Sequence, residues 1–247
     1  MSVSYDIYQR FQLELAEKFQ PLGWKYVKSG PCLKKKVKDI EFIITMGTWH
    51  NNIYSSRVRI GIMAYCKSMS RKNCPASTVL GFRLTPSNDE YFEWWELIPS
   101  EEYRFALEDS VDLLSKTILP LVEAFEENYE KTARSLALDG YSLCGALKDI
   151  CFPTIRFTSH LFGDFCGQQS ALRQYNMMSD NRKRWVLNQI EMYLSHMELA
   201  KRYLSNGAYY VNGDIMYMVD HGMIALSSDG NVIFPTIQEK EEQGIHN

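Results

Sequence analysis

The sequence predicts an α+β fold: an antiparallel β-meander flanked by helices, followed by a mainly helical C-terminal region that ends in a small β-meander. Three observations predict it. Apolar side chains recur every three or four residues in three separate stretches, as on the buried face of a helix. Between the first two stretches, apolar and polar residues alternate, as in half-buried strands. The 247 residues are 45% hydrophobic and 23% charged, which is ordinary globular composition.

The first predicted element is a helix over residues 5–19. Its buried face follows from apolar side chains at steps of three and four residues: Tyr8, Phe11, Leu15 and Phe19. Pro21 cannot continue the helical hydrogen-bond ladder, so we expect the helix to end there. Gly23 can supply a left-handed turn just after it.

Alternating stretches predict the strands of a four- or five-stranded antiparallel meander. They cover residues 40–46, 58–66, 78–85 and 90–97. Residues 50–52 form a polar turn between the first two stretches, and residues 86–89 favour turn geometry between the last two. We expect the helices on one face of this sheet.

A second helix is expected over residues 101–129. Ser100 is the predicted N-cap, and Glu101 and Glu102 lie in the first turn, where the helix dipole favours acidic side chains. Apolar residues then repeat at steps of four and three from Leu107 to Phe125. Pro120 lies inside this seam and predicts a kink or break near Ile118. The sequence thus indicates an α+β domain over residues 1–130.

The region 131–247 is expected to be mainly helical. Its clearest helix spans residues 181–205, starts behind Ser179 and Asp180, and has a seam of Val186, Ile190, Tyr193, Met197, Ala200 and Leu204. Asn212-Gly213 predicts a hairpin over residues 208–219, because this dipeptide suits a type I′ turn. Residues 223–226 and 232–234 extend it into a small meander. Whether the two regions pack as one unit stays open, as does a homodimer contact through a helical pair.

Several function classes lack their usual sequence signals. No apolar run is long enough to cross a bilayer, and residues 1–10 do not resemble a signal peptide, so we expect a cytoplasmic chain without a membrane partner. The six cysteines are irregularly spaced, which indicates reduced thiols rather than a disulfide framework. The glycines form no phosphate-binding motif and the histidines form no zinc-ligand pair. We therefore predict no cofactor and no metal.

The charge is unevenly distributed along the chain. Residues 1–83 carry a net charge of +9 and residues 84–130 a net charge of −11, within a total of −3. The basic side chains include Lys34, Lys36, Arg57 and Arg59, which alternate onto one face of their strands. One interpretation is an ordinary solvated face whose lysines protect an edge strand; the other is a docking surface for an acidic partner or for nucleic acid.

Two neighbouring tryptophans are further binding candidates. Trp94 and Trp95 point to opposite faces of a strand, so one is expected to enter the core. The other, with Tyr91 close in sequence, either packs in a satellite core, the more frequent case, or is an exposed residue of the kind that anchors protein interfaces.

The densest polar group lies within residues 156–167. His160, Asp164 and Cys166 together offer a base, an orienting carboxylate and a nucleophile. Catalytic Cys/His pairs usually meet across the fold from distant positions, however, and this stretch is rich in Phe and Gly. We favour packing over catalysis here and keep these three residues as weak catalytic candidates.

An ordered set of turn and core residues suggests a family. Pro21-Leu22-Gly23-Trp24-Lys25 follows the first helix, and the closing helix contains Ile118-Leu119-Pro120. This resembles a family of uncharacterised bacterial α+β domains that carry a Lys-Pro-Leu-Gly-Phe turn and a Leu-Pro closing helix, over residues 5–130. Gln20 and Trp24 replace the usual lysine and phenylalanine. The resemblance implies a bacterial or phage domain of a kind that partners or inhibits toxin or defence proteins, and transfers no catalytic residue.

These observations predict a non-enzymatic cytoplasmic binding protein that recognises or inhibits another protein. Its role would be in toxin immunity or in bacterial or phage defence. Two alternatives stay open. One is an enzyme that uses the Cys/His site near residues 156–167, and the other is nucleic-acid binding through the basic sheet face.

Overall fold

The computed structural model describes residues 3–48, 58–68, 78–84, 86, 94–98, 101–142, 150–196 and 212–237. The chain divides into two compact units, which are considered separately. Unit 1 comprises Met1–Ala133 and Gly140–Cys151, and unit 2 comprises Arg134–Asp139 and Phe152–Asn247. The mixture of helices with an antiparallel meander confirms the predicted α+β class.

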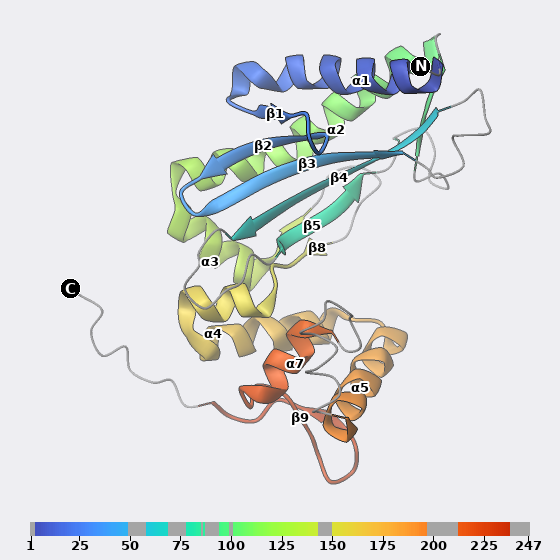
Figure 1. Cartoon of the computed structure of the whole chain (residues 1–247). Coiled ribbons are helices and arrows are strands. Elements are labelled where there is room, and N and C mark those ends of the chain that lie inside the picture. The colour runs from blue at the N-terminus through green and yellow to red at the C-terminus, as the bar shows by residue number, and fades with distance from the viewer. Residues whose placement is uncertain are drawn as a thin grey trace. The chain divides into compact units, whose positions relative to one another are not determined.

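Unit 1 is built on one antiparallel sheet. The strands are β1 (Lys25–Val27), β2 (Cys32–Val37), β3 (Ile40–Thr48), β4 (Val58–Ser68), β5 (Thr78–Leu84) and β6 (Trp95–Leu97). Strands β1 to β5 lie side by side in chain order, as Figure 1 shows. β6 pairs with Val58–Ile60 of β4, on the same edge of β4 that pairs with β5 from Ile62 onward. The alternation seen in the sequence is therefore that of a true meander.

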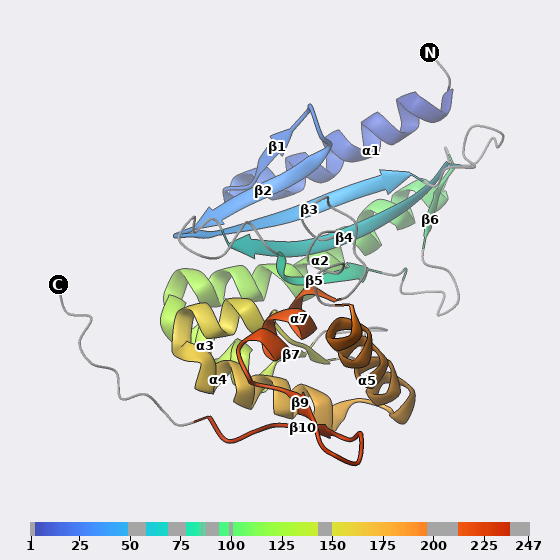
Figure 2. The same ribbon diagram turned by 60° about the horizontal axis from the view of Figure 1, so that its bottom comes forward.

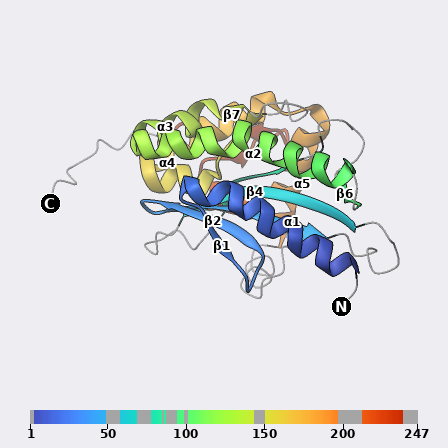
Figure 3. The ribbon, with the colours of Figure 1, turned by 90° about the horizontal axis from the view of Figure 1, so that it is seen from above.

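Helices α1 (Val3–Phe19) and α2 (Glu101–Glu127) pack on the same face of this sheet. Figure 3 shows the two helices next to each other. Phe42 of β3 meets Phe125 of α2 edge to face, and the Tyr8 hydroxyl of α1 donates to the Met46 carbonyl at 2.7 Å. Most of the seam predicted for each helix is buried, because it faces the apolar side of the strands, whereas Tyr8, Leu107 and Val111 are half-buried.

The structure tests two predictions about the helices of unit 1, namely the end of α1 and a break inside α2. The 3-10 turn η1 (Gln20–Leu22) follows α1, and Gly23 has φ 83°, which confirms the predicted left-handed turn. Of the kink or break predicted near Ile118, the break is wrong, because α2 is continuous through Pro120. Pro120 is exposed while Ile118 and Leu121 are buried, so packing of the seam holds the helix across the missing hydrogen bond.

Helix α3 (Tyr129–Asp139) begins in unit 1 and ends in unit 2. Asn128 separates it from α2 and accepts a hydrogen bond from the Lys131 amide at 3.1 Å. A short ribbon of β7 (Tyr141–Ser142) and β8 (Ile150–Cys151) completes unit 1. The Tyr141 hydroxyl ties this ribbon to α2 by donating to the Thr117 carbonyl at 2.7 Å.

Unit 2 is mainly helical. It contains α4 (Ile155–Met177), α5 (Asp180–Ser195) and α7 (Gly213–Asp220), followed by the antiparallel pair β9 (Ala225–Leu226) and β10 (Val232–Ile233). Figure 2 shows this pair at the end of the described chain. α5 begins directly behind Ser179, close to the predicted start, and the Ser179 side chain caps it by accepting from the Arg182 amide. The end of the helix predicted over residues 181–205 and the first strand of the predicted hairpin fall within residues 197–211, which lie outside the described residues. Met197, Ala200 and Leu204 are among them.

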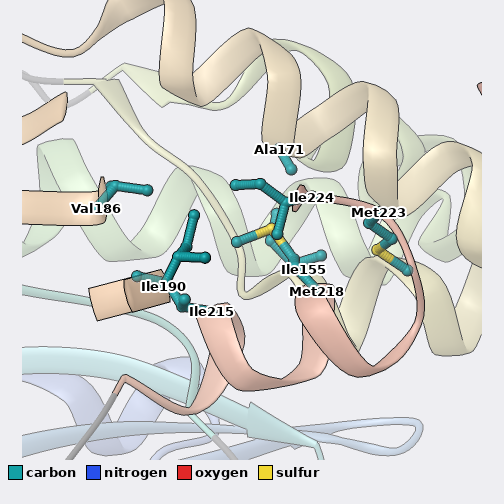
Figure 4. Packing of buried hydrophobic residues seen from close by; sticks show 8 residues of the cluster. All are labelled: Ile155, Ala171, Val186, Ile190, Ile215, Met218, Met223 and Ile224. Carbon is teal, nitrogen blue, oxygen red and sulfur yellow. The ribbon is translucent and has the colours of Figure 1, made fainter. Parts of the chain in front are cut away.

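The apolar core of unit 2 joins all three helices (Figure 4). It consists of Ile155, Ala171, Val186, Ile190, Ile215, Met218, Met223 and Ile224. Ile190 of α5 and Ile215 of α7 lie next to each other in this view. The seam predicted over Val186, Ile190 and Tyr193 is therefore buried, as expected.

The hairpin predicted around Asn212-Gly213 is wrong over its described half. Asn212 is the N-cap of α7, and its side-chain oxygen accepts from the amides of Asp214 and Ile215. Asn suits both a type I′ turn and a helix cap. Helix formation buries Ile215, Met216 and Met218 together, and this burial decides between the two.

Candidate binding face of the sheet

The sheet of unit 1 has two chemically different faces. Residues that pair across strands share a face, and successive residues alternate between faces. The core face carries Leu33, Ile44 and Ala64, which lie in register and are buried. The opposite face is called the outer face here; its described residues are Lys25, Val27, Cys32, Lys34, Lys36, Glu41, Ile43, Thr45, Gly47, Arg59, Gly61, Met63, Tyr65, Lys67, Gly81, Arg83, Trp94 and Glu96.

Basic side chains outnumber acidic ones on the outer face. Six of the residues named above are lysine or arginine and two are glutamate. Register aligns Lys25 with Lys34 across β1 and β2, and aligns Lys36, Glu41 and Lys67 across β2, β3 and β4. The predicted alternation of Lys34 and Lys36 onto one face therefore holds, and neighbouring strands extend it.

Glu41 lies between two of these lysines. Its Oε2 is 3.1 Å from Lys67 Nζ and 3.3 Å from Lys34 Nζ. Partial burial raises the pKa of Glu41, but hydrogen bonds from the two ammonium groups outweigh it and hold the pKa below its ordinary value. The carboxylate thus compensates part of the lysine charge and holds both side chains along the surface.

The other end of the outer face carries arginines and an aromatic ring. Arg59 donates from Nε to Glu96 Oε1 at 2.9 Å. The Arg83 guanidinium lies 4.2 Å from the centre of the Trp94 ring, in a cation-π contact. A Cβ at Gly61 would come within 2.9 Å of this ring, so only glycine leaves space for Trp94 against the backbone.

Accessibility varies over the outer face. Lys25 and Lys36 are exposed, Met63 is 49% exposed, and Trp94, Tyr65 and Lys34 are half-buried. Ile43 is only 2% exposed, so the accessible part of the face is formed by the longer side chains around it. The outer face thus combines an exposed methionine and a half-buried tryptophan with basic side chains, so it offers both apolar contact area and charge, as protein interfaces do.

The two tryptophans separate as the alternation predicted. Trp95 is buried and donates from Nε1 to the Asp109 carboxylate at 2.9 Å. It is therefore a core residue, and the prediction that it belongs to a binding surface is wrong. Trp94 remains on the outer face. Arg57 and Tyr91 lie outside the described residues. Sequence reasoning missed Lys67, Arg83 and Met63, although all three continue the alternation of their strands.

The catalytic candidates in unit 2 do not form one site. Asp164 Oδ2 lies 2.9 Å from Nδ1 of His221 and its Oδ1 accepts from the Tyr217 hydroxyl at 3.2 Å, whereas His160 is exposed and makes no such contact within the described chain. Burial raises the pKa of the Cys166 thiol, a shift that nearby Arg134 opposes, so the reactive thiolate is disfavoured. The trio suggested by the sequence is therefore corrected: Asp164 joins α4 to the end of α7.

Among the described residues, no group of three or more histidine, cysteine or acidic side chains is arranged to hold a metal ion. The helices in the described part of the chain are also too short or too polar to span a membrane. Comparison with models of protein families, with curated proteins and with solved structures gives no match. The resemblance to a bacterial domain family stays a prediction from its turn and core residues.

Proposed function

We propose that this protein is a non-enzymatic binding protein that uses the outer face of unit 1 to recognise an acidic surface of another protein. The observation that carries the proposal is the excess of basic side chains around an accessible methionine and tryptophan on one regular sheet face. The role would be that of a partner or inhibitor in toxin immunity or defence, as the resemblance implies.

The exposed lysines supply the charge for such recognition. Lys25 and Lys36 are exposed and make no ion pair with another described residue. Ion pairs with carboxylates of the partner would offset only part of the desolvation cost of these lysines. These two lysines would therefore set association rate and partner choice more than final affinity.

Met63 and Trp94 would supply the apolar anchor. Trp94 is held by Gly61 below it and Arg83 beside it, so little conformational freedom remains to be lost on binding. Met63 is the most exposed large apolar side chain of the outer face, and its flexible thioether adapts to different surfaces.

The arrangement favours a protein over a nucleic acid. Glu41 and Glu96 lie within the face and already pair with Lys34, Lys67 and Arg59. A phosphate backbone would meet both carboxylates and find fewer unpaired cations than the total suggests. An acidic protein surface needs only a few complementary contacts and gains from the apolar anchor.

The experiment compares a face variant with a matched control. The double substitution Lys25→Glu and Lys36→Glu changes the outer face, and Lys18→Glu with Lys131→Glu makes the same charge change at exposed helical positions elsewhere. Tagged full-length forms are used to capture partners from the source cells after nuclease treatment. We expect at least a tenfold loss of the captured protein for the face variant and little loss for the control.

Two results would contradict the proposal. Equal capture by the face variant and the wild type would show that the outer face does not dock the partner. Binding that is lost on nuclease treatment, together with tight binding of a single-stranded oligonucleotide and a steep salt dependence, would assign the face to nucleic acid instead.

A further inference from the structure

The second helix of unit 1 carries an acidic surface of its own. The exposed side of α2 has Glu101, Glu102, Glu108, Asp112, Glu123, Glu126 and Glu127 against Arg104 and Lys116. Phe105 lies among the first of these acids and is 38% exposed. This side, called the acidic stripe, combines negative charge with one accessible aromatic ring.

The charges of the acidic stripe fall into two groups. Glu101, Glu102 and Glu108 surround Phe105 at helical spacing, and a second group follows at residues 123–127. Between them, Asp112 pairs with Lys116. Glu108 and Glu123 are separated by about 22 Å along the helix axis, from a rise of about 1.5 Å per residue.

The basic side chains of the outer face extend along the whole length of β4. Arg59 and Lys67 lie near its two ends, about 26 Å apart at about 3.3 Å per residue. Met63 and Arg83 lie in the row midway between them. The lysines of β1 and β2 lie nearer the Lys67 end, in the rows of Tyr65 and Lys67.

We propose that the acidic stripe of one molecule docks on the outer face of a second copy of this chain. Phe105 and its neighbouring glutamates would meet Met63, Trp94 and the two arginines. Glu123 and Glu127 would meet the lysines, whereas Glu126 is paired with Lys35 of its own chain. The two surfaces carry charges of opposite sign, and each has an accessible apolar side chain beside its charges. The inference rests on the proposed function, because the same face serves both partners.

Such an interface joins two different surfaces, so the assembly is head to tail. Within unit 1, α2 covers the core face of the sheet and the outer face lies on the opposite side. One molecule can therefore use both surfaces at once. A heterologous contact of this kind does not stop at a dimer unless the rotation closes a ring.

The test is sedimentation velocity of the purified full chain over a range of protein and salt concentrations. We expect the wild type to exceed dimer mass as concentration rises and to dissociate in high salt. Lys25→Glu with Lys36→Glu, or Glu123→Lys with Glu127→Lys, should each weaken association at least tenfold. An equal mixture of these two variants should associate again, because the unchanged stripe of the first can dock on the unchanged outer face of the second, and their two reversed surfaces also carry opposite charges.

An apolar pair of variants checks the anchor. Phe105→Ser should weaken association several-fold, whereas Leu13→Ser, which removes an equally exposed apolar side chain from α1, should not. A wild type that stays monomeric, a mixture that associates no better than its parts, or equal effects of the two serine variants would overturn the proposal. Since no other protein is present, these outcomes are independent of the capture experiment that tests the proposed function.

Discussion

The two units use their polar side chains in different ways. In unit 1 the strands of the sheet satisfy each other's backbone groups, so charged side chains of the outer face are available for surface chemistry. In unit 2, polar side chains bind backbone groups that lie outside the helical hydrogen-bond ladders. The Gln168 amide donates to the carbonyls of Met223 at 2.8 Å and Pro235 at 2.6 Å.

The start of α4 is a second place in unit 2 where a polar side chain binds a backbone group. Asp214 of α7 accepts from the Ile155 amide at 3.3 Å and from Arg156 Nε at 3.2 Å. A carboxylate of the chain itself thus occupies the position at a helix N-terminus where an external anion could bind. This difference is why recognition is proposed for the sheet of unit 1, whereas the polar side chains of unit 2 named here have partners within their own chain.

The largest expected effect tests whether unit 2 depends on its apolar core. Ile190→Asp buries a carboxylate among aliphatic neighbours and should lower the free energy of unfolding by about 3–5 kcal/mol. Leu194→Asp, at an exposed position of the same helix, should change it by less than about 1 kcal/mol. Chemical denaturation followed by circular dichroism measures both. Similar values for the two variants would mean that the α5 seam is not a core.

The next prediction concerns the pair of tryptophans in unit 1. Trp95→Phe removes the hydrogen bond to the buried Asp109 carboxylate and should lower the free energy of unfolding by about 2 kcal/mol. Trp94→Phe should cost less than about 1 kcal/mol in stability, because Trp94 lies on the outer face. It should instead weaken partner capture. Thermal unfolding compares the two, and a larger loss for Trp94→Phe would reverse their assigned roles.

A smaller effect is expected from the cap of α7. Asn212→Ala leaves the amides of Asp214 and Ile215 without their side-chain acceptor and should cost about 1 kcal/mol. Asn212→Asp keeps an acceptor at this helix start and should retain most of the stability. Hydrogen exchange of the α7 amides reports the local loss. Unchanged protection in the alanine variant would count against the capping role.

The smallest effect concerns the acid dependence of unit 1. The folded-state pKa of Glu41 lies below its ordinary value of 4.5, so its contribution is complete above that value and is lost as pH falls through the lowered pKa. Glu41→Gln should remove this contribution, which is under about 1 kcal/mol for a partly exposed pair. Urea unfolding at neutral pH and near pH 3 should thus show a smaller acid-induced loss for Glu41→Gln than for wild type. An equal loss would show that the lysine contacts do not stabilise the carboxylate.

Much of the fold follows from local patterns. The helix over residues 5–19, the strands beginning at residues 40 and 58 and the helix starting behind Ser179 were all predictable, because each buries one side of a regular element and this periodicity is written in the sequence. The separation of Trp94 from Trp95 follows from the same alternation. The pairing of β6 with the same edge of β4 as β5 does not follow from local patterns, because strand pairing depends on contacts between distant segments.

What the sequence by itself determined is therefore the α+β class, the main elements and the side of each strand on which its basic residues lie. The tertiary structure alone decided that Asn212 caps a helix, that Asp164 pairs with His221 instead of His160, and that Lys67 and Glu41 join Lys34. Periodicity is a property of neighbouring residues in one element. The partner of a polar side chain is set by which elements burial brings together, and local sequence does not encode that choice.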